Sequence, residues 1–164
     1  MHTLNLDQGF AICVSLPKAL WGGNPLNEAL AVSPDSRWLY VVDTARGVVT
    51  TLDADALKVA RRVEVAFGPR SPDQARATVS PDGRSLLVAY GEALVVLDTA
   101  TLQPDRIWMM GDTVSGLGFS ADGLRLYVAM PDRVAVVDPS TGRETRTIAA
   151  PGVQGIRFVE TLSA

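Results

Sequence analysis

The sequence predicts an all-β protein, a β-propeller built of four-stranded antiparallel blades, and three observations carry this prediction. A Ser-Pro-Asp motif recurs, strand-like segments follow every copy in the same order, and proline or glycine separates the segments. The motif serines Ser33, Ser80 and Ser120 lie 47 residues (33 to 80) and 40 residues (80 to 120) apart. A period of about 40 residues with four short strands is typical of a propeller blade.

Each repeat contains four strand-like segments rich in β-branched and aromatic residues. The first is the short apolar run that precedes the motif. The other three recur at residues 38–42, 85–89 and 125–129, then at 48–53, 94–98 and 134–138, then at 60–65, 106–110 and 144–148. No segment carries an apolar stripe of helical period, which excludes a solenoid of helical repeats.

Turn chemistry explains the recurring motif. In the middle copy, residues 80–83, proline fixes φ, aspartate can bond its own backbone and glycine supplies a positive φ, so the chain reverses into a hairpin. Ser36 replaces the glycine in the first copy and Ala121 replaces the proline in the third, so these two turns should be slightly less favourable. A second recurrent turn, capped by a carboxylate, is predicted where each third segment ends, at Asp53, Asp98 and Asp138.

The repeats divide the chain into blades within a single propeller unit, residues 1–164. The predicted parts are a partial blade at 1–28, blades at 29–76, 77–116 and 117–155, and a terminal strand at 156–164. Segments 3–7 and 10–16 match the last two strands of a blade, and 156–158 matches a first strand.

The middle repeat, Ser80-Pro81-Asp82-Gly83-Arg84-Ser85-Leu86-Leu87-Val88-Ala89 with 93–101, resembles the YVTN β-propeller repeat of bacterial and archaeal surface or secreted proteins. The likeness extends over residues 30–150. It implies an extracytoplasmic location, in the periplasm or at the cell surface, and kinship with lactonase propellers and with the propeller subunit of quinohaemoprotein amine dehydrogenase. The asparagine-containing turn of the family is replaced at 43–46, 90–92 and 130–133, and WD-repeat and kelch signatures are absent.

An open arc of blades would expose apolar faces and strand edges, and three arrangements would cover them. The chain could be part of a longer propeller, of seven blades if the resemblance holds. It could pair with a second copy to form a homodimeric ring. Its terminal strand could instead join the N-terminal strands and close a small four-bladed ring.

Composition excludes several partner classes. The net charge is −3, so no basic field favours nucleic acid. No apolar stretch reaches the roughly 20 residues of a membrane-spanning helix. The N-terminus lacks the features of a secretory signal, although a signal could precede a fragment. Cys13 is the only cysteine, which excludes an intrachain disulfide, and its apolar neighbours predict a buried side chain.

The candidate binding site lies in the links between blades, because loops at one mouth of a propeller channel usually carry function. The links at 17–27 and 65–77 would place six residues on the same mouth: Trp21, Asn24, Glu28, Arg70, Asp73 and Arg76. They could form a polar pocket with an aromatic wall for an anionic or sugar-like ligand, or could simply be solvated loop residues. Weaker candidates in the later links are Asp112, Ser115 and Gln154.

No catalytic, cofactor or metal-binding signature is present in the sequence. His2 is the only histidine and stands on a terminus that we expect to be mobile, so neither a Ser-His-Asp triad nor a histidine-rich metal site is expected within this chain. Asp53 and Asp55 lack the glycine and glutamate of an EF-hand loop and are interpreted as a turn cap. Trp38 stands where the other repeats have Ser85 and Arg125, which predicts an outward or inter-blade position.

Two functions remain open from the sequence. The first is a non-enzymatic propeller whose loop-bearing mouth binds a protein, a glycan or a small ligand. The second, implied by the family resemblance, is a lactonase-like hydrolase or the propeller subunit of a periplasmic dehydrogenase. An enzyme would need polar side chains that converge in the channel, and Glu28 with Arg76 is the pair that the sequence offers.

Overall fold

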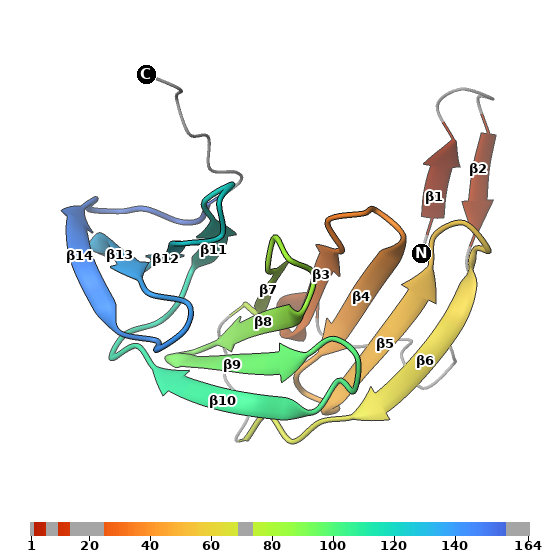
Figure 1. The fold of residues 1–164 in the computed structure, drawn as a ribbon, viewed down its shortest axis with the longest axis horizontal. Coiled ribbons are helices and arrows are strands. Elements are labelled where there is room, and N and C mark those ends of the chain that lie inside the picture. The colour runs from red at the N-terminus through yellow and green to blue at the C-terminus, as the bar shows by residue number, and fades with distance from the viewer. Residues whose placement is uncertain (1, 6–9, 14–24, 69–73, 157–164) are drawn as a thin grey trace.

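The computed structural model describes residues 2–5, 10–13, 25–68 and 74–156 (Figure 1). The described residues contain no α-helix, and strands form three four-stranded antiparallel sheets, as the sequence predicts. Each sheet consists of four consecutive strands in chain order, so each is a meander in which neighbouring strands are joined by a short turn. We call the three sheets blades A, B and C.

The strand bounds follow the predicted repeats closely. Blade A contains β3 (Glu28–Val32), β4 (Trp38–Asp43), β5 (Val48–Asp53) and β6 (Lys58–Glu64). Blade B contains β7 (Arg76–Val79), β8 (Ser85–Tyr90), β9 (Ala93–Asp98) and β10 (Pro104–Met109). Blade C contains β11 (Gly116–Phe119), β12 (Leu126–Ala129), β13 (Arg133–Val137) and β14 (Glu144–Ala149). A short 3-10 helix, η2 (Pro25–Asn27), precedes blade A.

The N-terminal strands β1 (His2–Asn5) and β2 (Phe10–Cys13) form a separate antiparallel hairpin. They fall on the segments 3–7 and 10–16 that the sequence predicts for a partial blade, of which residues 6–7 and 14–16 lie outside the described residues. Most of the predicted terminal strand, 157–164, lies outside the described residues, and Ile156 is not in a strand.

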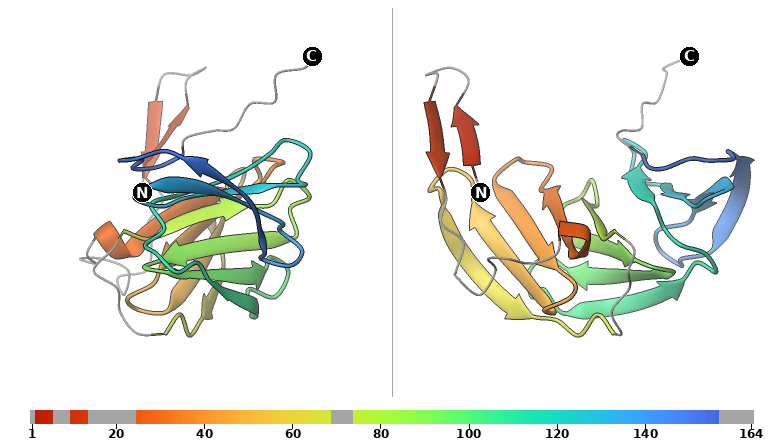
Figure 2. Two further views of the ribbon diagram at one scale, coloured as in Figure 1. Left: turned by 90° about the vertical axis from the view of Figure 1, so that its left-hand side faces the viewer. Right: turned by 180° about the vertical axis from the view of Figure 1, so that it is seen from behind.

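The blades fan out as an arc around their first strands. β3 lies beside β7, and β7 lies beside β11, so the first strand of each blade is the innermost (Figure 1; Figure 2, right). Blades A and C stand at the two ends of the arc. Because the four strands of each blade alternate in direction, the links between blades all emerge at one face and the Ser-Pro-Asp turns emerge at the opposite face.

The hydrophobic core lies between the blades rather than within one of them. One cluster joins blades A and B, where Val42 and Val49 pack with Leu86 and Leu97. A second cluster joins blades B and C. Burying a large aliphatic side chain stabilises the fold by about 1.5–3 kcal/mol, so stacking neighbouring blades is what makes each sheet stable. Trp38 packs against the first cluster, which places it on the inter-blade surface.

The Ser-Pro-Asp turns have the geometry that the sequence predicts. The Ser80 hydroxyl donates a 2.5 Å hydrogen bond to Asp82, whose Oδ1 accepts the N–H of Arg84 at 3.1 Å. The same hydroxyl accepts the N–H of Ser85 at 2.9 Å. The position predicted to need a positive φ has φ values of 60°, 74° and 72° at Ser36, Gly83 and Gly123.

The second recurrent turn is also confirmed. Asp98 Oδ1 accepts the N–H of Thr101 at 2.7 Å, and Asp138 Oδ1 accepts the N–H of Ser140 at 2.8 Å. This turn has one feature that the sequence did not predict. The residue four positions after each aspartate has a positive φ, in the left-handed region. The residues are Leu57, Leu102 and Gly142, with φ of 50°, 59° and 72°. A leucine there carries backbone strain, which burial of Leu102 between blades A and B helps to offset.

Candidate binding face

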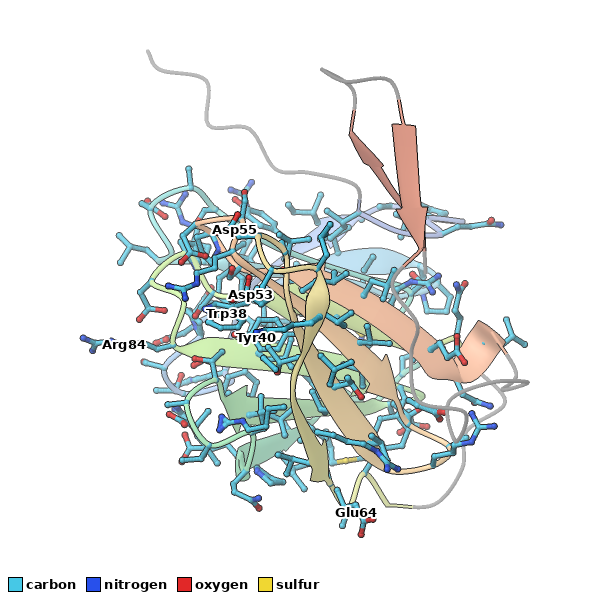
Figure 3. The ribbon with its side chains drawn as sticks, turned by 90° about the vertical axis from the view of Figure 1, so that its right-hand side faces the viewer. Trp38, Tyr40, Asp53, Asp55, Glu64 and Arg84 are labelled. Atoms are coloured by element: carbon cyan, nitrogen blue, oxygen red, sulfur yellow. The ribbon has the colours of Figure 1, made fainter. Side chains whose placement is uncertain are left out.

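The link-bearing face is formed by the connections between blades and by the turns between the second and third strands. Residues 65–68 and 74–75 belong to the described part of the first link, and residues 110–115 form the second. Figure 3 shows Asp53, Asp55 and Trp38 at one side of blade A, with η2 at the other, so η2 marks the link-bearing face. Backbone bonds tie the first link to its surroundings: Val65 N–H donates to Gly47 O of blade A at 2.7 Å, and Ala75 N–H donates to Leu26 O of η2 at 2.6 Å.

Two of the six predicted binding residues are described by the structure. Glu28 begins β3 and Arg76 begins β7, so they occupy the same end of neighbouring innermost strands. Both side chains are partly buried. The other four predicted residues, Trp21, Asn24, Arg70 and Asp73, lie outside the described residues.

Arg76 spans the interface between blades B and C. Its Nε donates a 2.7 Å hydrogen bond to the carbonyl oxygen of Ser115, and Nη1 donates to the carbonyl of Ala75 at 3.2 Å. Burial lowers the pKa of the guanidinium, because removing water disfavours the charged form. The salt bridges found among the described residues do not include one between Arg76 and Glu28.

The weaker candidates have structural partners or lie at the surface. Asp112 accepts the N–H of Thr113 at 2.7 Å, which is a local cap. The Ser115 hydroxyl donates to the carbonyl oxygen of Ala129 at 3.3 Å, and Gln154 is exposed on the segment that follows blade C.

A buried carboxylate on this face was not singled out from the sequence. Asp43, at the end of β4, is 3% exposed and forms a 2.7 Å salt bridge with Arg46. The next residue, Thr44, donates from its N–H and its hydroxyl to the carbonyl of Asn27, which fixes η2 against blade A. The one indication in the sequence was that residues 43–46 depart from the asparagine-containing turn of the YVTN repeat.

The opposite, turn-bearing face carries a hollow that sequence reasoning also missed. It measures about 650 Å³ and lies between blades A and B, with walls that include Trp38, Tyr40, Thr51 and Arg61. Burial raises the pKa of the Tyr40 hydroxyl. A smaller hollow of about 330 Å³ occupies the corresponding place between blades B and C. The aromatic substitution at Trp38 was the only sequence signal for the larger hollow.

Two features are absent from the described residues, a cluster of metal-binding side chains and a helix that could span a membrane. There, no group of three or more histidine, cysteine, aspartate or glutamate side chains is placed to hold a metal ion. No helix in that part of the chain is long and apolar enough to span a membrane.

Comparison with known proteins supports the architecture. No protein-family model matches the chain, and no curated protein matches it. The fold is similar to that of the hydrazine synthase of Kuenenia stuttgartiensis, with a TM-score of 0.66 and 25% identity over 86% of this chain and 42% of that chain. It is also similar to the WD40 repeats of RRP9, with a TM-score of 0.63 and 18% identity over 78% of this chain and 40% of that chain.

A third similar structure is U3-55K, with a TM-score of 0.63 and 17% identity over 78% of this chain and 41% of that chain. The fold is a β-propeller. Together with the three stacked blades, these similarities confirm the fold predicted from the repeats. The chain spans about two fifths of the length of each of these three structures.

Proposed function

We propose that this propeller is a non-catalytic scaffold of the YVTN type, located outside the cytoplasm, which binds a protein, a glycan or a small ligand at its link-bearing face. One observation carries the proposal: the polar side chains that recur in the repeats bond to the backbone. The motif serines and aspartates close turns, and Arg61 and Arg106 bond carbonyl oxygens of the next blade. Residues used in this way stabilise a scaffold and leave recognition to the links between blades.

The ligand chemistry follows from the two described residues of the candidate site. Arg76 has one guanidinium nitrogen, Nη2, beyond those that bond Ser115 and Ala75, and Glu28 supplies carboxylate oxygens at the same end of the neighbouring strand. A cationic donor beside an acidic acceptor suits a ligand with both hydroxyl and carboxylate groups. Acidic glycans have this combination of groups.

The enzymatic alternative is a lactonase-like hydrolase or the propeller subunit of a periplasmic dehydrogenase. The similarity to hydrazine synthase, at 25% identity over 86% of this chain, favours a propeller associated with a redox enzyme. In such an enzyme Glu28 and Arg76, at the same end of neighbouring innermost strands, are the pair of polar groups that we would assign to the channel.

The test is binding to an array of neutral and acidic glycans, together with a lactone hydrolysis assay. We expect acidic glycans to bind without turnover, and Arg76→Ala to weaken binding about tenfold, which corresponds to about 1.4 kcal/mol. Arg84→Ala is the matched control, since Arg84 lies on the turn-bearing face of the same blade. Lactone hydrolysis that is lost in folded Arg76→Ala or Glu28→Ala would contradict the proposal.

A further inference from the structure

The two blade interfaces within the chain are built from the same contacts. On the fourth strand of blade A, Arg61 donates to the carbonyl oxygen of Ala100 in blade B. On the fourth strand of blade B, Arg106 donates to the carbonyl oxygen of Ser140 in blade C at 2.6 Å. Both carbonyls belong to the turn after the third strand of the receiving blade. The corresponding residue of blade C is Arg146, which is exposed on β14.

Apolar contacts repeat in the same way. Trp108, two residues after Arg106, lies so close to Gly142 of blade C that a Cβ added to that glycine would overlap the indole ring. Two residues after Arg61, Val63 packs against the cluster between blades A and B. The corresponding residue of blade C is Ile148, which is 40% exposed. Blade C therefore presents the donating half of a blade interface that no described segment covers.

Blade A presents the receiving half. Leu30 and Val32 on β3 are 57% and 55% exposed, although the corresponding residues of blades B and C pack against the preceding blade. Val41 and Leu52 form a small separate cluster with Leu39, Leu57 and Val59, all within blade A. Four of the corresponding residues of blade B are part of the cluster that joins blades A and B: Leu86, Val88, Leu97 and Leu102.

Charge favours a match between these two surfaces. The turn of blade A that corresponds to Ala100 and Ser140 carries Asp55 at the same position, exposed beside Asp53 (Figure 3). An arginine docked on this turn would meet a carboxylate as well as the carbonyl. Arg146 is the arginine that the repeat places there, and an Arg–carboxylate pair strengthens such a contact.

We propose that blade C of one copy docks on blade A of a second copy, so that two chains close a ring head to tail. Each copy supplies one donating surface, on blade C, and one receiving surface, on blade A. A two-fold rotation axis between the copies brings blade C of each copy against blade A of the other. Arg146 bonds the turn at residue 55 of the second copy, and Ile148 packs near residue 57. Blades A and C stand at opposite ends of the arc in both views, so the two surfaces do not meet within one chain (Figures 1 and 2).

The mass of the purified chain in solution is the first test. We expect a dimer by light scattering, with a dissociation constant that rises about tenfold in Arg146→Ala. Arg143→Ala is the matched control, because Arg143 is an exposed arginine in the turn before β14 and should leave the dimer intact. A monomer, or a ladder of larger oligomers, would overturn the proposal.

A disulfide trap distinguishes a second copy from self-closure. In a Cys13→Ser background, Ile148→Cys with Leu57→Cys should give a covalent dimer on oxidation, since corresponding positions touch at the interface of blades B and C. Met109→Cys with Leu57→Cys is the control, because Met109 is exposed on β10 away from both surfaces. A bridge within a monomer would show self-closure and overturn the proposal. The result does not depend on whether the link-bearing face binds a ligand.

Discussion

The guanidinium of Arg106 and the backbone carbonyl of Ser140 are joined by a 2.6 Å hydrogen bond across the interface between blades B and C. These residues are 34 positions apart in the chain. The corresponding bond between blades A and B, from Arg61 to Ala100, joins residues 39 positions apart. A side chain on the outermost strand of blade A, and another on that of blade B, therefore bonds the blade that follows.

Loss of this bond should destabilise the protein modestly. We expect Arg106→Ala to lower the free energy of unfolding by about 1 kcal/mol, because the side chain is 42% exposed and water partly replaces the bond. Urea unfolding measures the change. Arg143→Ala, on an exposed arginine of the next blade, should change stability by less than about 0.5 kcal/mol. Equal losses in the two variants would argue against a specific inter-blade role.

Gly142 should tolerate no side chain, for two separate reasons. Its φ is 72°, and an added Cβ would overlap the Trp108 ring. We expect Gly142→Ala to cost about 2–4 kcal/mol of unfolding free energy, from backbone strain together with overpacking. Thermal unfolding checks this cost.

Gly111 provides the control for Gly142. Its φ is 76°, but nothing lies within 4 Å of an added Cβ, so Gly111→Ala should show the backbone cost alone, about 1 kcal/mol. Trp108→Ala should partly rescue Gly142→Ala in a double-mutant cycle. The overlap would be refuted if both glycine variants lost the same stability.

The Ser80 hydroxyl should contribute more than a neighbouring hydroxyl. It donates to Asp82 and accepts the N–H of Ser85. Ser80→Ala therefore removes one hydrogen-bond donor from the Asp82 carboxylate and the acceptor of the Ser85 N–H. We expect a loss of about 1–2 kcal/mol in urea unfolding, because the serine is 9% exposed and water replaces it poorly. Ser85→Ala removes a hydroxyl five residues away and should be nearly neutral. A Ser85→Ala loss as large as that of Ser80→Ala would contradict this assignment.

Stability should fall in acid through the recurrent turns. Hydrogen bonds from Ser33, Ser80 and Ser120 lower the pKa of the aspartate two residues later below the model-compound value of 3.8. The unfolded chain then binds more protons in acid, so the contribution is present above pH 3.8 and is lost as the pH falls through the lower folded values.

The urea midpoint as a function of pH measures this effect. It should be nearly constant between about pH 5 and 7 and should decline below about pH 4. Asp82→Asn should flatten the decline, whereas Asp105→Asn, at an exposed aspartate of the same blade, should not. A decline that is equally steep in both variants would count against the turns as its source.

The candidate site was less accessible to sequence reasoning than the fold. The repeat predicts that links gather at one face, and the structure brings Glu28 and Arg76 to the same end of adjacent strands. The sequence did not predict that Arg76 would bond Ser115, because these two residues are 39 positions apart and the contact crosses from one blade to the next. Buried Asp43 was missed for a similar reason, since Asn27, which anchors its turn, lies 17 positions before Thr44.

The sequence by itself determined the period, the strands and the chemistry of the turns. Those features depend on residues within five positions of one another, as the bonds of Ser80 show, so they can be read from a short segment. The tertiary structure decided which carbonyls Arg61 and Arg106 bond, and which faces of blades A and C stay uncovered. These outcomes depend on how one sheet stacks on the next, and stacking is a property of residues that meet only after the strands have paired.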